Sequence, residues 1–184
     1  MAALPPPDPV QITSFNTLPL ASGQNEPEVT TIKSTISPEE MFDGGIRRTV
    51  IGSTTIPANN DGPLQVDQLP GSGIVMPGAL NAYFLDLAPG FVTPIHRTVS
   101  IDYLVVIKGT PSIITPKGPF SVVDGKASYT DTVETVLAEG QVLVQRGQMH
   151  ALANNTESWV RFWCVVADAK PQHADSIELR EAWL

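Results

Sequence analysis

Short, nearly continuous apolar runs recur along the chain and are separated by breaks that contain glycine or proline. Their β-branched and aromatic residues favour strands. The expected strands lie at residues 47–51, 81–87, 101–107, 133–137, 142–144 and 160–166. Turn signals bound several of them, namely Pro89-Gly90, Lys108-Gly109, Glu139-Gly140 and Arg146-Gly147. Strands that are apolar on both faces and joined by short turns predict an all-β, closed or sandwiched antiparallel barrel.

The beginning of the chain departs from this pattern. Residues 1–43 are polar and rich in proline, serine and threonine, which predicts a partly extended arm. One helical turn is expected at residues 38–41, where Ser37 can cap it. The barrel itself is expected to occupy residues 44–168.

The end of the chain and one internal stretch also differ. Residues 169–184 are predicted to be a linker followed by a short helix, because residues 174–184 have an apolar stripe at helical spacing. Residues 115–131 are long and polar for a hairpin, so we expect either a lid or a loose loop there.

Composition and charge narrow the classes of function. The 184 residues suit one domain, and the 17 prolines and 14 glycines fit many strands joined by tight turns. The formal net charge is -8, and the 11 Lys and Arg residues are scattered, so no groove for nucleic acid is expected. The sequence has neither a secretory signal at its start nor an apolar stretch of the ~20 residues that span a membrane. We therefore expect a soluble, cytoplasmic protein, with the single cysteine, Cys164, in its core.

Two of the three histidines lie in spaced motifs. In the first, Gly90 is followed after five residues by His96-Arg97-Thr98, then by Asp102 and Gly109. In the second, Gly140 is followed after five residues by Arg146-Gly147, then by His150 and Asn154. The first resembles the leading cupin motif, and the second is similar to a version of the other cupin motif that is one residue shorter. The resemblance covers about residues 44 to 168 and implies a cupin barrel, also called a double-stranded β-helix or jelly roll.

The resemblance also implies a site, and this chain departs from it. The full cupin metal site uses three His and one Glu, but Thr98 and Asp102 stand at two of those positions. His96, Asp102 and His150 remain as catalytic candidates. They can act without a metal, or they can hold a divalent ion such as Fe, Mn, Ni or Zn. Residues 96, 98 and 102 have the same parity, so on an extended strand they share one face.

Four residues are candidates for binding a small-molecule substrate: Thr98, Arg146, Arg161 and Trp163. Arg146 either reaches inward to an anionic group or belongs to a surface turn. Arg161 and Trp163 share one face of a strand, which lines the pocket if it points inward and an interface if it points outward. Periodicity alone leaves both pairs of alternatives open.

The first hypothesis is an enzyme of secondary metabolism that moves protons, in a dehydration, isomerisation, cyclisation or decarboxylation. His96 and His150 would be general acid and base, with Asp102 orienting one imidazole. The second is a metal-dependent dioxygenase or Lewis-acid lyase, and the third is a barrel that binds a small ligand without converting it. The structural alternative is that His96 and His150 are a pair of core histidines in a cupin that has lost activity.

A homodimer is expected as well. The resemblance implies pairing of two barrels through their N-terminal strands, and an apolar outer face at Tyr103, Val105 and Ile107 suits such an interface.

Overall fold

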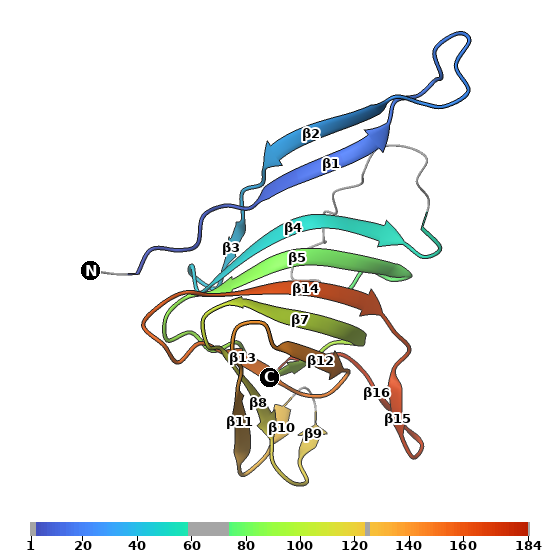
Figure 1. Ribbon diagram of the computed structural model, residues 1–184. Helices are drawn as coiled ribbons and strands as arrows, with labels where there is room; N and C mark the ends of the chain where they lie inside the picture. The colour runs from blue at the N-terminus through green and yellow to red at the C-terminus, as the bar shows by residue number, and fades with distance from the viewer. Residues whose placement is uncertain (1–2, 59–73, 124–125, 184) are drawn as a thin grey trace.

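The computed structural model describes residues 3–58, 74–123 and 126–183, and in these ranges the chain forms seventeen strands and no helix. Figure 1 shows the strands as two layers that face each other below a projecting hairpin. The expectation of an all-β barrel is confirmed. No helix that could cross a membrane is found in the described ranges.

The larger layer is a six-stranded antiparallel sheet. In spatial order its strands are β12 (Val142–Arg146), β7 (Ser100–Lys108), β14 (Val160–Asp168), β5 (Ala79–Leu87), β4 (Ile46–Thr55) and β3 (Glu39–Met41). Five of the six expected apolar runs lie in this sheet, as β4, β5, β7, β12 and β14, and β14 pairs with β5 on one side and β7 on the other. The sixth run, at residues 133–137, forms β11 (Thr132–Val136) in the smaller layer.

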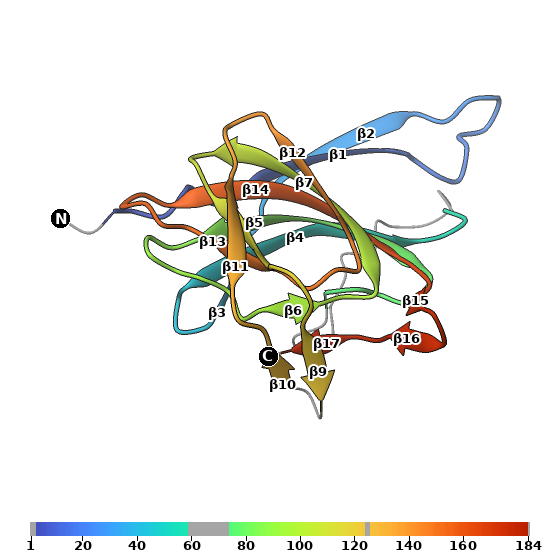
Figure 2. The same cartoon turned by 90° about the horizontal axis from the view of Figure 1, so that it is seen from below.

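The smaller layer closes the barrel. It contains a three-stranded sheet in the order β11 (Thr132–Val136), β8 (Ser112–Pro116) and β13 (Ala151–Ala153). Two isolated bridges continue it, one between Val92 and Ala153 and one between His96 and His150. A two-stranded pair of β6 (His96–Arg97) and β17 (Ala182–Trp183) lies at the edge of this layer, as Figure 2 shows.

The core lies between the layers and depends on alternation along the strands. On β14, Val160, Phe162, Cys164 and Val166 are almost completely buried, while the residues between them are partly exposed. Alternate side chains of a strand point to opposite faces, so this series marks the inner face of the sheet. Burying one such side chain stabilises the fold by about 1.5–3 kcal/mol. Cys164 is a buried, free cysteine, as expected.

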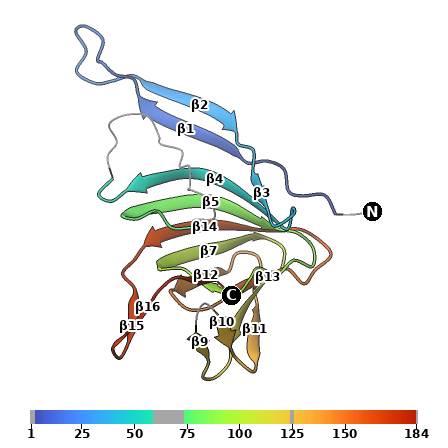
Figure 3. The ribbon, with the colours of Figure 1, turned by 180° about the vertical axis from the view of Figure 1, so that it is seen from behind.

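The arm before the barrel is a hairpin of β1 (Val10–Asn16) and β2 (Val29–Thr35) that projects from the body (Figure 3). The predicted helical turn at residues 38–41 is wrong, because Glu39–Met41 form β3 at the edge of the six-stranded sheet. Pairing with β4 supplies the backbone hydrogen bonds that an isolated turn would leave unmade.

The predicted C-terminal helix is also wrong. The segment forms a hairpin of β15 (Gln172–Ala174) and β16 (Ile177–Leu179), followed by β17. The two-residue connection begins with Asp175, whose φ of 54° is the left-handed conformation of a tight hairpin turn. Asp tolerates that conformation, so its presence favoured a hairpin over a helix.

Residues 115–131 contain a further hairpin, β9 (Ser121–Val123) with β10 (Lys126–Ser128). The strand β9 is exposed along its length. Strand pairing therefore replaces the loose loop that was one of the two expectations, while residues 124–125 lie outside the described ranges.

Candidate functional site

His96 and His150 come together although they are far apart in the sequence. Their backbones form an antiparallel bridge in which each N–H donates to the other carbonyl, both at 2.9 Å. Residues directly opposite each other place their side chains on the same face. The ring centroids are consequently 4.4 Å apart, with the rings tilted by 54°. The two imidazoles therefore lie together, while the further expectation that the carboxylate of Asp102 joins them stays a prediction.

Backbone carbonyls fix the orientation of both rings. Nδ1 of His96 lies 2.9 Å from the carbonyl oxygen of Pro94, and Nδ1 of His150 lies 3.0 Å from that of Gln148. A carbonyl can only accept, so in each neutral ring Nδ1 carries the proton and Nε2 keeps its lone pair. Both histidines thus present Nε2 as the atom that can accept a proton.

Burial keeps this pair neutral. His96 and His150 are 6% and 3% exposed, and loss of solvation lowers the pKa of each ring. The pKa of His150 falls to about 4, first because of burial and then because a charge on nearby His96 would repel its own. At neutral pH two unprotonated Nε2 atoms therefore lie on neighbouring, buried rings.

Asp102 lies on the inner face of β7 and is 5% exposed. Burial raises its pKa to about 6, and the hydroxyls of Ser100 and Thr98 act in the opposite direction. Ser100 donates a hydrogen bond to Oγ1 of Thr98 at 2.8 Å. Oδ1 of Asp102 has no hydrogen-bond partner among the described residues. A buried carboxylate with a free oxygen is costly, which marks this position as a place where a ligand can bind.

Gln145 is a site residue that the motif reasoning did not single out. It lies directly opposite Asp102 in the β12–β7 register, is 2% exposed, and its Nε2 has no partner within the part of the chain that is described. A buried acceptor on Asp102 and a buried donor on its cross-strand neighbour form a complementary pair of contacts for a hydroxyl or a carboxyl group. The signal in the sequence was a polar residue at an inward position of a strand that is otherwise apolar.

The three catalytic candidates do not form a metal centre. In the ranges that the structure covers, no three His, Cys, Asp or Glu side chains are grouped so that they could hold an ion. His96 and His150 form a pair without a third ligand, and Thr98 replaces an imidazole. The arrangement does not fit a site of two histidines and one carboxylate, which requires three ligands around one ion.

Arg161 and Trp163 do not line the interior, so the expectation that they bind substrate there needs correction. They alternate with the buried Phe162 and Cys164 and therefore point to the outer face of the sheet. Arg161 donates two hydrogen bonds to Asp86, at 2.6 and 2.7 Å, and lies 5.3 Å from the centre of the Phe84 ring. The ring of Trp163 packs edge-on against Phe84 at 4.8 Å.

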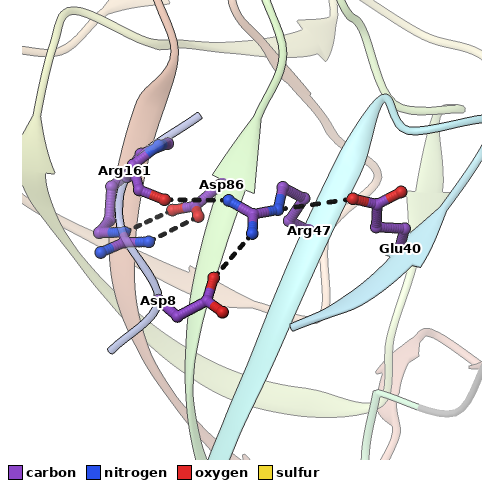
Figure 4. Close-up of polar contacts among 6 residues, drawn as sticks. Asp8, Glu40, Arg47, Asp86 and Arg161 are labelled. Carbon is purple, nitrogen blue, oxygen red and sulfur yellow. Dashed lines mark hydrogen bonds and ion pairs between the residues drawn. The ribbon is translucent and has the colours of Figure 1, made fainter. Parts of the chain in front are cut away.

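Figure 4 shows a cluster of charged side chains that the sequence reasoning missed, made up of Asp8, Glu40, Arg47, Asp86 and Arg161. Arg47 donates to the carboxylate of Asp8 at 2.8 Å and to the carbonyl of Pro6 at 3.0 Å. The cluster ties the start of the chain to the sheet. A charged residue in the middle of an apolar run, as Asp86 is, was the available signal.

Thr98 and Arg146 line a small, half-open pocket of about 80 Å³ beside Lys170, not the space between the histidines. Thr98 is buried and Arg146 is exposed, which agrees with the surface-turn alternative for Arg146.

Trp183 is the second residue that the motifs did not reveal. Its indole stacks on the imidazole of His96, with ring centroids 4.5 Å apart and planes within 7°. Ile177, Leu179 and Trp183 occur at odd positions, and this two-residue period was the signal for strands in place of a helix.

Comparison with known proteins finds relatives whose names contain the cupin domain. A cupin-domain-containing oxidoreductase of Hypocrea virens is 30% identical over 53% of this chain and 44% of its own length. Another, from Aspergillus ruber, is 33% identical over 41% of this chain and 30% of its own. Over about half of its length the chain is thus similar to proteins that contain a cupin domain.

Other relatives come from biosynthetic clusters. Phomopsin biosynthesis cluster protein D of Diaporthe leptostromiformis is 33% identical over 56% of this chain and 48% of its own length. The chain thus spans about half the length of the curated relatives it matches. No family model matches. A solved double-stranded β-helix protein from Klebsiella pneumoniae is 17% identical, covering 78% of this chain and 88% of that one at a TM-score of 0.47.

Proposed function

We propose that this protein is an enzyme of secondary metabolism that uses His96 and His150 for acid–base chemistry on a small molecule. The candidate reactions are dehydration, isomerisation, cyclisation and decarboxylation. The observation that carries the proposal is the pair of buried imidazoles 4.4 Å apart, each with Nδ1 bound to a backbone carbonyl. The relatives named for biosynthetic clusters support a role in secondary metabolism.

The chemistry follows from the protonation state of the pair. One neutral Nε2 accepts a proton from a carbon or oxygen of the substrate, and that ring becomes an imidazolium. The second ring stays neutral, because two charges at this separation repel each other. The imidazolium then returns the proton to another atom of the substrate. In a dehydration that atom is the departing hydroxyl oxygen, which leaves as water.

Asp102 and Gln145 would orient the substrate in this scheme. Their free buried oxygen and nitrogen can accept from and donate to one hydroxyl or carboxyl group. Thr98 and Ser100 hold the carboxyl of Asp102 from the other side. The geometry favours a role in substrate binding for Asp102 over direct support of an imidazole, since no hydrogen bond joins them among the described residues.

Substitution of the histidines tests the proposal. His96→Ala and His150→Ala should each lower turnover of the substrate by about a hundredfold or more. His173→Ala is the matched control, because His173 lies on the exposed strand β15. The substrate can be sought among intermediates that accumulate in a deletion strain. Unchanged turnover in both site variants would contradict the proposal, and binding without any turnover would favour a ligand-binding barrel.

A second candidate is an oxidoreductase, because two relatives carry that name. Metal analysis of the purified protein separates the two. About one equivalent of Fe, Mn, Ni or Zn that is lost in His96→Ala would favour this candidate over metal-free acid–base chemistry.

We also propose a homodimer. The β1–β2 hairpin exposes apolar side chains on both of its faces: Val10, Ile12 and Val29 on one, and Phe15 and Ile32 on the other. The outer face of the sheet exposes another such set at Tyr103, Ile107, Val142 and Val144. A second copy of the chain supplies the matching apolar surface for both, which an isolated subunit leaves in water.

A further inference from the structure

The strand β17 covers one face of the histidine pair. Its pairing with β6 sets Trp183 opposite His96, and Figure 2 shows the two strands side by side. The indole lies 4.5 Å from the imidazole and almost parallel to it. His96 therefore contacts two rings, those of His150 and Trp183, and the second belongs to a segment outside the barrel sheets.

Few contacts hold β17 to the rest of the molecule. It is two residues long and pairs only with the equally short β6 in the described ranges. The guanidinium of Arg97 donates to the carbonyl of Arg180 at 3.3 Å, a long hydrogen bond. The indole N–H of Trp183 donates to Glu181, two residues away, so that bond does not join the segment to the barrel.

The preceding strands add little to this attachment. β15 and β16 pair with each other, and most of their residues are exposed. Segments with few buried contacts open at a much lower free-energy cost than core strands. The segment that covers His96 is thus the part of the site that can move while the barrel stays folded.

The stacking geometry defines what can take the place of the indole. A near-parallel ring pair at this distance is an arrangement that flat π systems adopt. An aromatic or conjugated ring can occupy the same position without displacing His96, whereas a tetrahedral or branched group would lose contact across most of the imidazole face. The position is therefore selective for planar groups.

We propose that β17 is a displaceable cap, and that Trp183 occupies on His96 the position taken by a planar, conjugated or aromatic ring of the substrate. This rests on the proposed function, because it concerns the same histidines. When the cap is closed, it shields His96 from water. When it opens, a flat ligand replaces the indole and brings its reacting atoms to the Nε2 atoms of the pair.

Binding of free indole tests which groups the position accepts. In Trp183→Ala, indole should cause a saturable upfield shift of the His96 ring proton in NMR spectra, with at least tenfold tighter apparent binding than in the unsubstituted protein. Trp159→Ala is the control, because the Trp159 indole donates to Ala3 instead of contacting the site. Cyclohexanol, of similar size but not planar, should cause no such shift. Absence of a saturable shift in Trp183→Ala, or equal affinity for indole and cyclohexanol, would overturn the proposal.

Amide hydrogen exchange of the unsubstituted protein tests the movement without any variant. The amides of β17 should exchange at least a hundredfold faster than those of β14, whereas the amide of His96 donates to His150 and does not report the cap. Exchange as slow as in β14 would show that the cap opens only on global unfolding, which contradicts the proposal. Neither experiment measures turnover, so failure of the cap is distinguishable from failure of the acid–base function, which the His96 and His150 variants test.

Discussion

At the scale of single residues, the titrating groups of the site respond to acid in opposite directions. His150 has a pKa of about 4 in the fold, against an ordinary value of 6.5. Between these values the unfolded chain binds more protons, so lowering the pH destabilises the fold through this residue, by up to about 3 kcal/mol. Asp102 has its pKa raised from 3.8 to about 6, so the folded carboxyl binds a proton first and acid stabilises the fold through it.

This opposition predicts the effect of Asp102→Asn. The variant lacks the Asp102 carboxyl, whose protonation stabilises the fold more and more as the pH falls. Its free energy of unfolding should therefore drop more steeply between pH 7 and 4.5 than that of the unsubstituted protein. The expected extra loss is about 2 kcal/mol. Urea unfolding at the two pH values measures it, and Asp175→Asn on an exposed turn is the control. Parallel pH profiles for Asp102→Asn and the unsubstituted protein would refute the assignment.

Gly109 offers a second prediction at this scale. Its φ is +83°, and a Cβ there would meet Cγ1 of the buried Val160 at 2.7 Å. Gly140 has a similar φ of +80° but has open space around it. Both Gly→Ala variants should lose about 1 kcal/mol from the backbone conformation. Gly109→Ala should lose a further ~1–3 kcal/mol from overpacking, as measured by urea unfolding. Equal losses would contradict the close packing against Val160.

At the scale of elements, the outer face of β5 and β14 carries a charged pair that joins neighbouring strands. The side chain of Asp86 is 1% exposed and that of Arg161 is 11% exposed. Removing one partner of a buried pair leaves the other charge without compensation. The cluster therefore fixes the register of β5 against β14 and, through Arg47, the path of the first residues of the chain (Figure 4).

We predict that Asp86→Ala destabilises the fold by about 3–5 kcal/mol, because it leaves the charge of the Arg161 guanidinium without its partner. Glu40→Ala is the control, since Glu40 is 67% exposed and lies 3.7 Å from Arg47. An exposed pair of this kind contributes about 0–1 kcal/mol. Chemical denaturation gives both values, and a loss below 1 kcal/mol for Asp86→Ala would mean that the pair does not stabilise the sheet.

The elements also show what could be predicted from the sequence. Apolar runs bounded by turn residues located the barrel strands, because strands buried on one face need apolar residues there whatever their partners are. The motif spacing located His96 and His150, whose convergence depends on the barrel closing. The segment that ends with Trp183 was assigned to the wrong element, because a short exposed strand is set by pairing with β6, a contact that local periodicity does not encode. Local periodicity also does not encode which face of β14 points into the barrel. The side of the sheet on which Arg161 lies could therefore not be predicted before the neighbours of β14 were known.

At the scale of the whole molecule, the exposed apolar surfaces of the hairpin and the sheet make an isolated subunit incomplete. We expect the mass of a dimer by light scattering at micromolar concentration. Ile12→Asp, on the exposed face of β1, should shift the protein toward the monomer, because the substitution places a charge in the apolar contact. Lys117→Asp is a control for changed charge, because Lys117 is 63% exposed and belongs to neither apolar set. A monomeric mass for the unsubstituted protein would contradict the dimer.

The barrel and its connections bring the two histidines together and keep water from them, and all the proposed chemistry depends on that enclosure. Nitrogen-15 and proton NMR of histidine-labelled protein at pH 7 tests it most directly. The account predicts that His96 and His150 are both neutral, with the proton on Nδ1, and that a nuclear Overhauser effect connects their rings. A protonated imidazole at either position, or no contact between the two rings, would contradict it.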